Sequence, residues 1–158
     1  MKKFIPLISI FSIIIAYTII SQIYAESFSF MDAMRHFMAG FFIVFGGFKI
    51  LNWKGFVEAY QMYDVVAKRS VFYAYLYPII ELSLGSAYLF NIYPFATNLI
   101  TLIVMGVGII GVVQALQKRE EIQCACLGAV FKIPMTKVTL LEDVLMAVMA
   151  LIMLIIII

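Results

Sequence analysis

Both cysteines of the chain, Cys124 and Cys126, lie in one polar stretch that follows a long apolar segment. Two thiols at this spacing can form a disulfide, exchange with a thiol or disulfide of a partner, or bind a soft metal ion as thiolates. Lys118 and Arg119 precede the pair, and nearby positive charge favours the thiolate form. The pair supplies two ligands, whereas a closed zinc site needs four. The spacing therefore favours a functional pair over two structural cysteines, and it leaves open whether the pair is a catalytic dithiol or a metal-binding pair of thiolates.

Glu81 lies near the middle of another apolar segment, where an unpaired carboxylate is costly. Pro78 precedes it by three residues, removes a backbone donor and leaves a carbonyl group free. Glu81 could be an auxiliary polar site that relays protons or contacts an ion or a quinone head. Alternatively, it makes a structural hydrogen bond to Tyr77, Ser83 or a neighbouring helix.

Methionine and histidine offer a weaker metal site. Met31, Met34 and Met38 share one face of an expected helix, and Asp32 and His36 lie four residues apart on another. Thioethers and imidazole suit Cu(I). Because methionine usually serves in packing, Met34, Met38 and His36 are only a secondary prediction of soft-metal ligands.

The glycines Gly106, Gly108 and Gly111 match the G-x-G-x-x-G pattern, but they lie within an apolar segment and follow no strand. This context excludes a dinucleotide-binding loop. We expect these glycines, with Gly40 and Gly47, to let helices approach one another closely.

The elements that must position these side chains are membrane helices. Of 158 residues, 65% are hydrophobic and 13% are charged, roughly half the ~25% charge of a soluble domain. The net charge of +2, with no basic patch, predicts no nucleic-acid partner. The composition predicts an all-α, polytopic bundle in a lipid bilayer.

Five apolar segments have the length of a membrane span, about 20 residues each. They cover residues 4–24, 34–51, 71–90, 98–116 and 140–158. Ser29 with Asp32, and Thr139 with Glu142, have the spacing of capping boxes at the starts of the second and fifth spans.

Basic residues are distributed unevenly between the two sides of the predicted bundle. Counted by alternate segments with the span ends included, ten lie on one side and one, Arg35, on the other. The positive-inside rule places the N-terminus and the Cys-x-Cys loop in the cytoplasm and the C-terminus outside, in a cell inner membrane. Arg35 and Lys49 flank the second span, and either is a possible partner for Glu81.

The first apolar segment has a second interpretation as a signal peptide, because Lys2 and Lys3 precede it. The segment is longer than a usual signal core, and Ile23 is a poor residue for the cleavage site. We therefore favour a transmembrane helix.

Between the second and third spans, Phe56, Tyr60, Tyr63 and Ala67 recur at helical spacing. This pattern predicts a short helix. It lies either in the membrane interface with its aromatic rings among the headgroups, or packed against the bundle as a loop helix.

Several stretches together resemble the MauE/DoxX-like redox-associated membrane proteins. They are residues 34–40, 48–52, 77–82 and 124–128, followed by Pro134 and Met135. The resemblance covers about residues 30–158 and implies a four-helix domain there, with residues 1–29 added as an N-terminal transmembrane helix and outer loop. The family's Cys-x-Cys before the last helix matches Cys124 and Cys126.

The resemblance implies thiol and disulfide redox support at the membrane, as in maturation of a disulfide-rich enzyme of methylamine utilisation, with a thiol-redox protein as partner. Similar bundles that carry a heavy-metal-associated domain imply soft-metal transport or handling, with a metal chaperone as partner. The cofactors compatible with these readings are a soft metal ion or a quinone. A non-catalytic membrane partner subunit is the third alternative.

Overall fold

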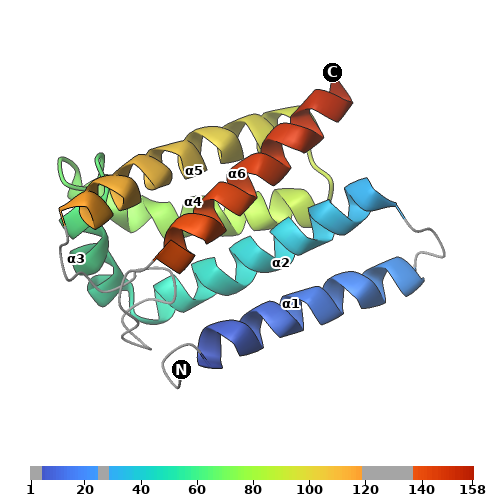
Figure 1. The fold of residues 1–158 in the computed structure, drawn as a ribbon, viewed down its shortest axis with the longest axis horizontal. Coiled ribbons are helices and arrows are strands. Elements are labelled where there is room, and N and C mark those ends of the chain that lie inside the picture. Colours follow the sequence, from blue (N-terminus) through green and yellow to red (C-terminus); the bar gives the residue numbers. More distant parts are fainter. Residues whose placement is uncertain (1–4, 25–28, 119–136) are drawn as a thin grey trace.

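The computed structural model describes residues 5–24, 29–118 and 137–158, and these residues form helices and short connections without strands. The helices are α1 (Ile5–Tyr24), α2 (Phe30–Leu51), α3 (Trp53–Tyr63), α4 (Val71–Leu89), α5 (Pro94–Gln117) and α6 (Lys137–Ile157). The long helices lie side by side, and the short α3 lies at one end of the bundle (Figure 1). The predicted all-α class is confirmed.

Four segments are long and apolar enough to cross a membrane: α1, α2, α5 and the Leu140–Ile157 part of α6. The remaining long helix, α4, has 19 residues, but its four tyrosines and Glu81 make it more polar. The protein is therefore a multi-pass membrane protein by the length and composition of these four helices.

Helices α2 and α5 begin earlier than the predicted spans. Helix α2 begins at Phe30, and Ser29 is its N-cap, with the hydroxyl accepting the Asp32 backbone N–H at 3.4 Å. Helix α5 begins at Pro94, four residues earlier than predicted, because a proline fits the first turn of a helix without losing a hydrogen bond.

The capping box predicted at Thr139 is wrong. Helix α6 begins at Lys137, so Thr139 lies inside the first turn and not at the N-cap. No proline or glycine lies between residues 135 and 139, so nothing in the sequence stops the helix from starting earlier.

The bundle consists mainly of two packed pairs, α2 with α4 and α5 with α6, and α1 packs on the outer side of α2. Gly85 lets α4 approach α2, since a Cβ there would lie 2.8 Å from Ile43 Cγ1 and 3.0 Å from Ile43 N. In α1 only four side chains are buried, which are Leu7, Ile10, Ile14 and Gln22.

The glycines of α5 have different surroundings. A Cβ on Gly111 would lie 2.9 Å from the carbonyl oxygen of Tyr63 and 3.0 Å from Asp64 Cα, so Gly111 lets the end of α3 rest on α5. Gly40 similarly faces Ile14 of α1 at 3.2 Å. Nothing lies within 4 Å around Gly47 or Gly106, so the prediction of close packing is wrong for those two, which point away from neighbouring helices.

Gly111→Ala should destabilise the protein by about 1–3 kcal/mol, the usual cost of overpacking. The backbone of α3 has to move to admit the methyl group. Thermal unfolding of the purified protein in detergent measures the loss. Gly106→Ala, in the same helix, is the matched control and should leave the unfolding midpoint unchanged or slightly raised. Equal behaviour of the two variants would contradict the packing of α3 on α5.

Candidate functional site

A buried ion pair joins α2 to α4. Lys49 Nζ donates a hydrogen bond to Glu81 Oε1 over 2.5 Å, and the two residues are only 6% and 1% exposed. Each charge offsets the desolvation of the other, and removing one partner would leave the other unpaired. Of the partners predicted for Glu81, a neighbouring helix supplies the ion-pair partner through Lys49. Ser83 instead donates its hydroxyl to the backbone carbonyl of Ile79.

Arg35 lies at the opposite end of α2 and does not reach Glu81. Its guanidinium donates to the carbonyl oxygens of Tyr88 and Leu89 at 3.0 and 3.1 Å, and it pairs with Asp32 at 3.0 Å. Arg35 therefore ties the start of α2 to the end of α4.

Aromatic rings enclose the ammonium group of Lys49. Its Nζ lies 4.9 Å from the ring centroid of Tyr77 and 5.6 Å from that of Phe56, within the range of cation–π attraction. The centroid of Tyr60 lies 4.6 Å from that of Tyr77 and 5.0 Å from that of Phe56. Phe56 and Tyr60 come from α3, so the aromatic face of this helix packs inside the protein. Of the two interpretations of this helix, the packed loop helix agrees with the structure.

Polar caps determine where α3 begins and ends. The Asn52 side chain accepts the backbone N–H of Gly55 at 3.3 Å and starts the helix. After the helix, Asp64 Oδ1 accepts the backbone N–H groups of Val66 and Ala67 at 2.9 and 2.7 Å. These short-range hydrogen bonds form the turn that leads to α4 and hold the aromatic rings over Lys49.

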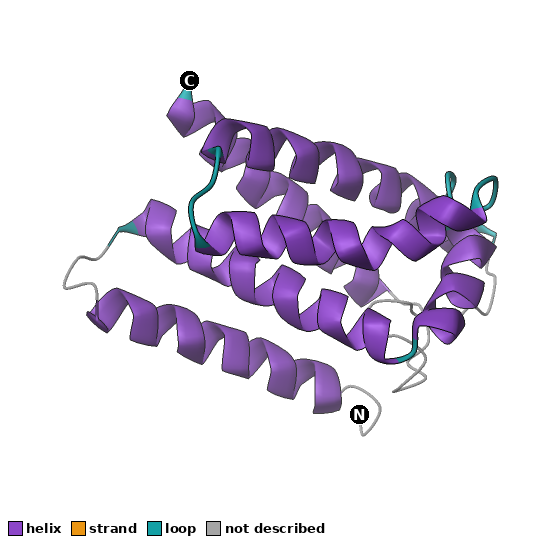
Figure 2. Cartoon of the chain, turned by 180° about the vertical axis from the view of Figure 1, so that it is seen from behind, coloured by secondary structure: helices purple, strands orange, loops and turns teal. Residues whose placement is uncertain are grey.

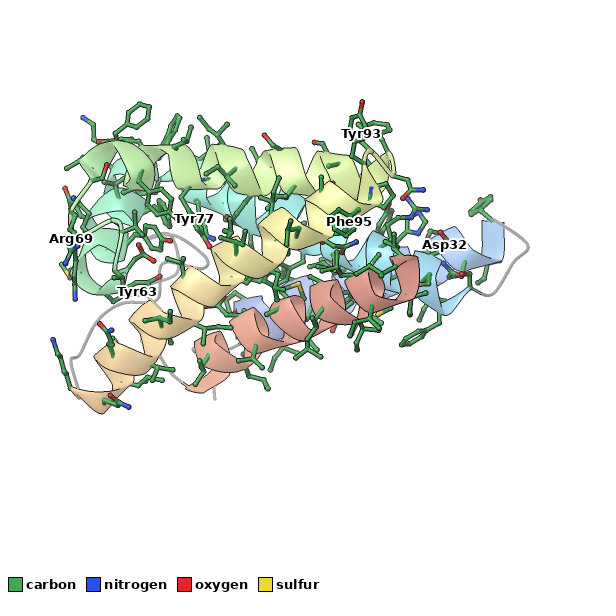
Figure 3. All side chains as sticks on the ribbon, turned by 90° about the horizontal axis from the view of Figure 1, so that it is seen from above. Asp32, Tyr63, Arg69, Tyr77, Tyr93 and Phe95 are labelled. Carbon is green, nitrogen blue, oxygen red and sulfur yellow. The ribbon has the colours of Figure 1, made fainter. Side chains whose placement is uncertain are left out.

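A small cavity lies beside the ion pair. Its volume is about 30 Å³, and its walls come from α2 to α6: Lys49, Phe56, Tyr60, Tyr63, Tyr77, Gly108 and Asp143. A cavity of this size has room for one or two water molecules. A quinone ring would not fit, since a cavity that accepts benzene measures about 150 Å³. In Figure 3, Tyr63 and Tyr77 lie at the α3 end of the bundle, far from Asp32 and Tyr93.

Several buried oxygen atoms have no hydrogen-bond partner among the described residues, and they belong to residues that line the cavity or adjoin its lining in the sequence or through Lys49. They are Tyr60 Oη, Asp64 Oδ2 and Glu81 Oε2, and a fourth, Glu142 Oε1, lies one residue before Asp143. Unpartnered buried oxygens of this kind indicate water or another small ligand. The cavity is therefore polar enough to be hydrated.

The two phenols from α3 are held in their neutral form. Burial raises the pKa of Tyr60 well above its usual range, and the nearby Tyr77 and Asp64 raise it further. Burial likewise raises the pKa of Tyr63, with added contributions from Asp143 and Asp64. Both hydroxyls therefore remain hydrogen-bond donors at physiological pH.

Asp143 lines the cavity from α6 and was missed by sequence reasoning. A Cβ on Gly108 of α5 would lie 3.5 Å from Asp143 Oδ2, an ordinary van der Waals distance, so the carboxylate of Asp143 lies next to the backbone of α5. The described residues contain only two ion pairs, and Asp143 is in neither. A usable signal was present in the sequence, because Asp143 is an acidic residue early in an apolar span.

The secondary metal ligands are not brought together into one cluster. Met34 and Met38 are buried in the hydrophobic core. His36 lies beside Tyr17 of α1, and its Nδ1 is 2.8 Å from the carbonyl oxygen of Asp32. In the described part of the chain, no group of three or more His, Cys, Asp or Glu side chains could hold a metal ion.

Cys124 and Cys126 lie outside the described residues. The chain enters their segment from the end of α5, at Gln117, and leaves it at the start of α6, at Lys137. Both helix ends lie toward the α3 end of the bundle in Figures 1 and 2.

Fold and site together define a polytopic helical membrane protein with a buried ion pair and a small polar cavity. The family model described as Methylamine utilisation protein MauE matches residues 27–156, and the chain belongs to this family. The matched range begins after α1. No curated protein and no solved structure matches the chain.

Lys49→Met should destabilise the protein by about 3–5 kcal/mol, because it leaves Glu81 buried without its partner. The double variant Lys49→Met with Glu81→Leu should recover most of that loss. Unfolding in detergent measures the free energy of unfolding of the unsubstituted protein, of Lys49→Met and of the double variant.

Asp32→Asn is the control for this pair. It breaks the more exposed Arg35–Asp32 pair, whose contribution should stay below about 1 kcal/mol. A double variant as unstable as Lys49→Met alone would contradict the proposed role of the buried pair.

Proposed function

We propose that this protein supports thiol–disulfide exchange at the cell inner membrane through Cys124 and Cys126. The observation that carries the proposal is family membership, together with the family's Cys-x-Cys pattern at the only two cysteines of the chain. The cysteines belong to the connection between α5 and α6, which pack against each other along the bundle. Glu81 is then an auxiliary polar site in the same bundle.

The exchange needs a partner protein that carries a disulfide or a dithiol. In one direction, the thiolate of one cysteine attacks a sulfur of the partner's disulfide and forms a mixed disulfide. The second thiolate displaces the partner's thiolate, so a Cys124–Cys126 disulfide forms and the partner becomes a dithiol. Two electrons pass to the partner together with the two protons of the original thiols. The reverse sequence oxidises a partner dithiol.

We infer that α4 is a fifth crossing of the membrane. The indole N–H of Trp53, just after α2, donates to the carbonyl oxygen of Tyr75 early in α4 at 3.0 Å. At the other end, Arg35 of α2 binds the carbonyl oxygens of Tyr88 and Leu89. Helix α4 therefore runs antiparallel to α2 over nearly its whole length, and α2 is long and apolar enough to cross. The ion pair of Glu81 with Lys49 removes the main obstacle to placing α4 in lipid.

Five crossings put the N-terminus and the α5–α6 connection on one side and the C-terminus on the other. The basic residues of the described loops and helix ends agree with a cytoplasmic position for the first of these sides. Lys54, Lys68, Arg69 and Lys118 belong to the α3 end, whereas Arg35 belongs to the opposite end.

Alkylation of thiols in native membranes tests the redox chemistry. We expect Cys124 and Cys126 to be partly oxidised and to become fully alkylated only after reduction. A single substitution, Cys124→Ser or Cys126→Ser, should trap a mixed disulfide with the partner, because the resolving thiol is missing.

The double variant Cys124→Ser with Cys126→Ser is the control and should form no such adduct. The redox proposal would be wrong if the cysteines were always reduced and the protein bound stoichiometric Cu, Zn or Hg that the double variant loses. Soft-metal transport or handling would then be the function. If the double variant still supports normal maturation of a disulfide-rich enzyme of methylamine utilisation, neither cysteine proposal holds. The remaining alternative is then a non-catalytic partner subunit.

Labelling with a membrane-impermeant thiol reagent tests the orientation. The reagent should reach Cys124 and Cys126 in inside-out vesicles and not in intact spheroplasts. Ile158→Cys, introduced into the double serine variant, should give the opposite result because it marks the C-terminus. Labelling of both positions from the same side would contradict five crossings.

A further inference from the structure

Two carboxylates lie around the single ammonium group of Lys49. Lys49 bonds directly to Glu81, and Asp143 lines the same cavity without an ion pair of its own. One ammonium group can fully balance only one of the two carboxylates. A second carboxylate without a cation of its own is costly to bury, and uptake of a proton removes that cost.

The helices around the cavity supply one cation and several acidic groups. Helix α2 supplies the single cation, and α5 contributes only Gly108, which does not titrate. The other groups are neutral phenols or acids: Tyr60 and Tyr63 of α3, Asp64 at its end, Tyr77 and Glu81 of α4, and Glu142 and Asp143 of α6. The local charge is therefore negative unless a cation or a proton is taken up.

Water can reach and stabilise the uncompensated group. Tyr60 is 3% exposed and lines the cavity, and its hydroxyl has no hydrogen-bond partner among the described residues. The cavity of about 30 Å³ has room for a water molecule, and both Tyr60 and Asp143 line it.

We propose that this cavity is a proton-binding site, in which the Asp143 carboxyl takes up one proton and, once ionised, competes with Glu81 for the ammonium group of Lys49. A proton suits the site better than a metal cation for two reasons. The ammonium of Lys49 already occupies the cavity and repels a second cation. The described residues also offer no group of three acidic or histidine ligands. The inference does not depend on the cysteine chemistry, because all its groups lie in the described helices and at the end of α3.

Infrared difference spectroscopy of the full chain in lipid nanodiscs tests the proposal. Acidification should produce the carbonyl band of a protonated carboxyl group, and this band should move to lower frequency in heavy water when the carboxyl proton is exchanged for deuterium. Asp143→Asn should remove this band. Asp32→Asn, at the far end of α2, is the control and should keep it. A band that survives in Asp143→Asn, or that disappears in Asp32→Asn, would overturn the assignment.

A second variant keeps the test valid if Asp143→Asn does not fold. Tyr60→Phe retains the ring and removes only the unpartnered hydroxyl, so the band should persist at a shifted frequency because its hydrogen bonding has changed. An unchanged frequency would overturn the hydrated site. Replacing choline with sodium at constant pH should have no effect on the band, and its loss in sodium would show that a metal cation is the ligand.

Discussion

The bundle depends on the ion pair between Lys49 and Glu81. A carboxylate in the middle of α4 and an ammonium near the end of α2 would each be costly in lipid, and together they are tolerated only if they meet. The meeting requires that both helices turn these faces toward each other. Gly46 makes this possible, because a Cβ there would lie 3.3 Å from Glu81 Cβ. One polar contact thus sets the rotation of two helices about their axes.

The surroundings of the pair follow from the same constraint. Once the ammonium lies inside the bundle, aromatic faces are favourable neighbours, and α3 supplies Phe56, Tyr60 and Tyr63 from a short capped helix. Gly111 lets the end of α3 rest directly on α5. The α5–α6 pair then closes the cavity with Gly108 and Asp143. Five helices, α2 to α6, therefore surround the cavity beside this one ion pair.

Family membership and the polar cavity concern two different parts of one membrane protein. The MauE family match directs attention to Cys124 and Cys126, in the connection between α5 and α6. The cavity lies between the helices that this connection joins and the α2–α4 pair. Thiol exchange moves protons together with electrons, so a proton-binding cavity in the same bundle is chemically compatible with a dithiol. The two proposals rest on separate residues and stand or fall separately.

The sequence by itself determined the all-α membrane class, the Ser29 cap, the placement of Glu81 inside the bundle and the family. It predicted five spans, and four of the described helices are long and apolar enough to cross a membrane. These features depend on local composition, short-range hydrogen bonds or motif spacing. Only the tertiary structure decided that Lys49 and not Arg35 pairs with Glu81, that the rings of α3 face inward, and that Asp143 lines the cavity. The reason is physical: Lys49 and Glu81 are separated by 32 positions, and their contact depends on how two helices are rotated and staggered. Local patterns do not specify that geometry; packing at Gly46, Gly85 and Gly111 does.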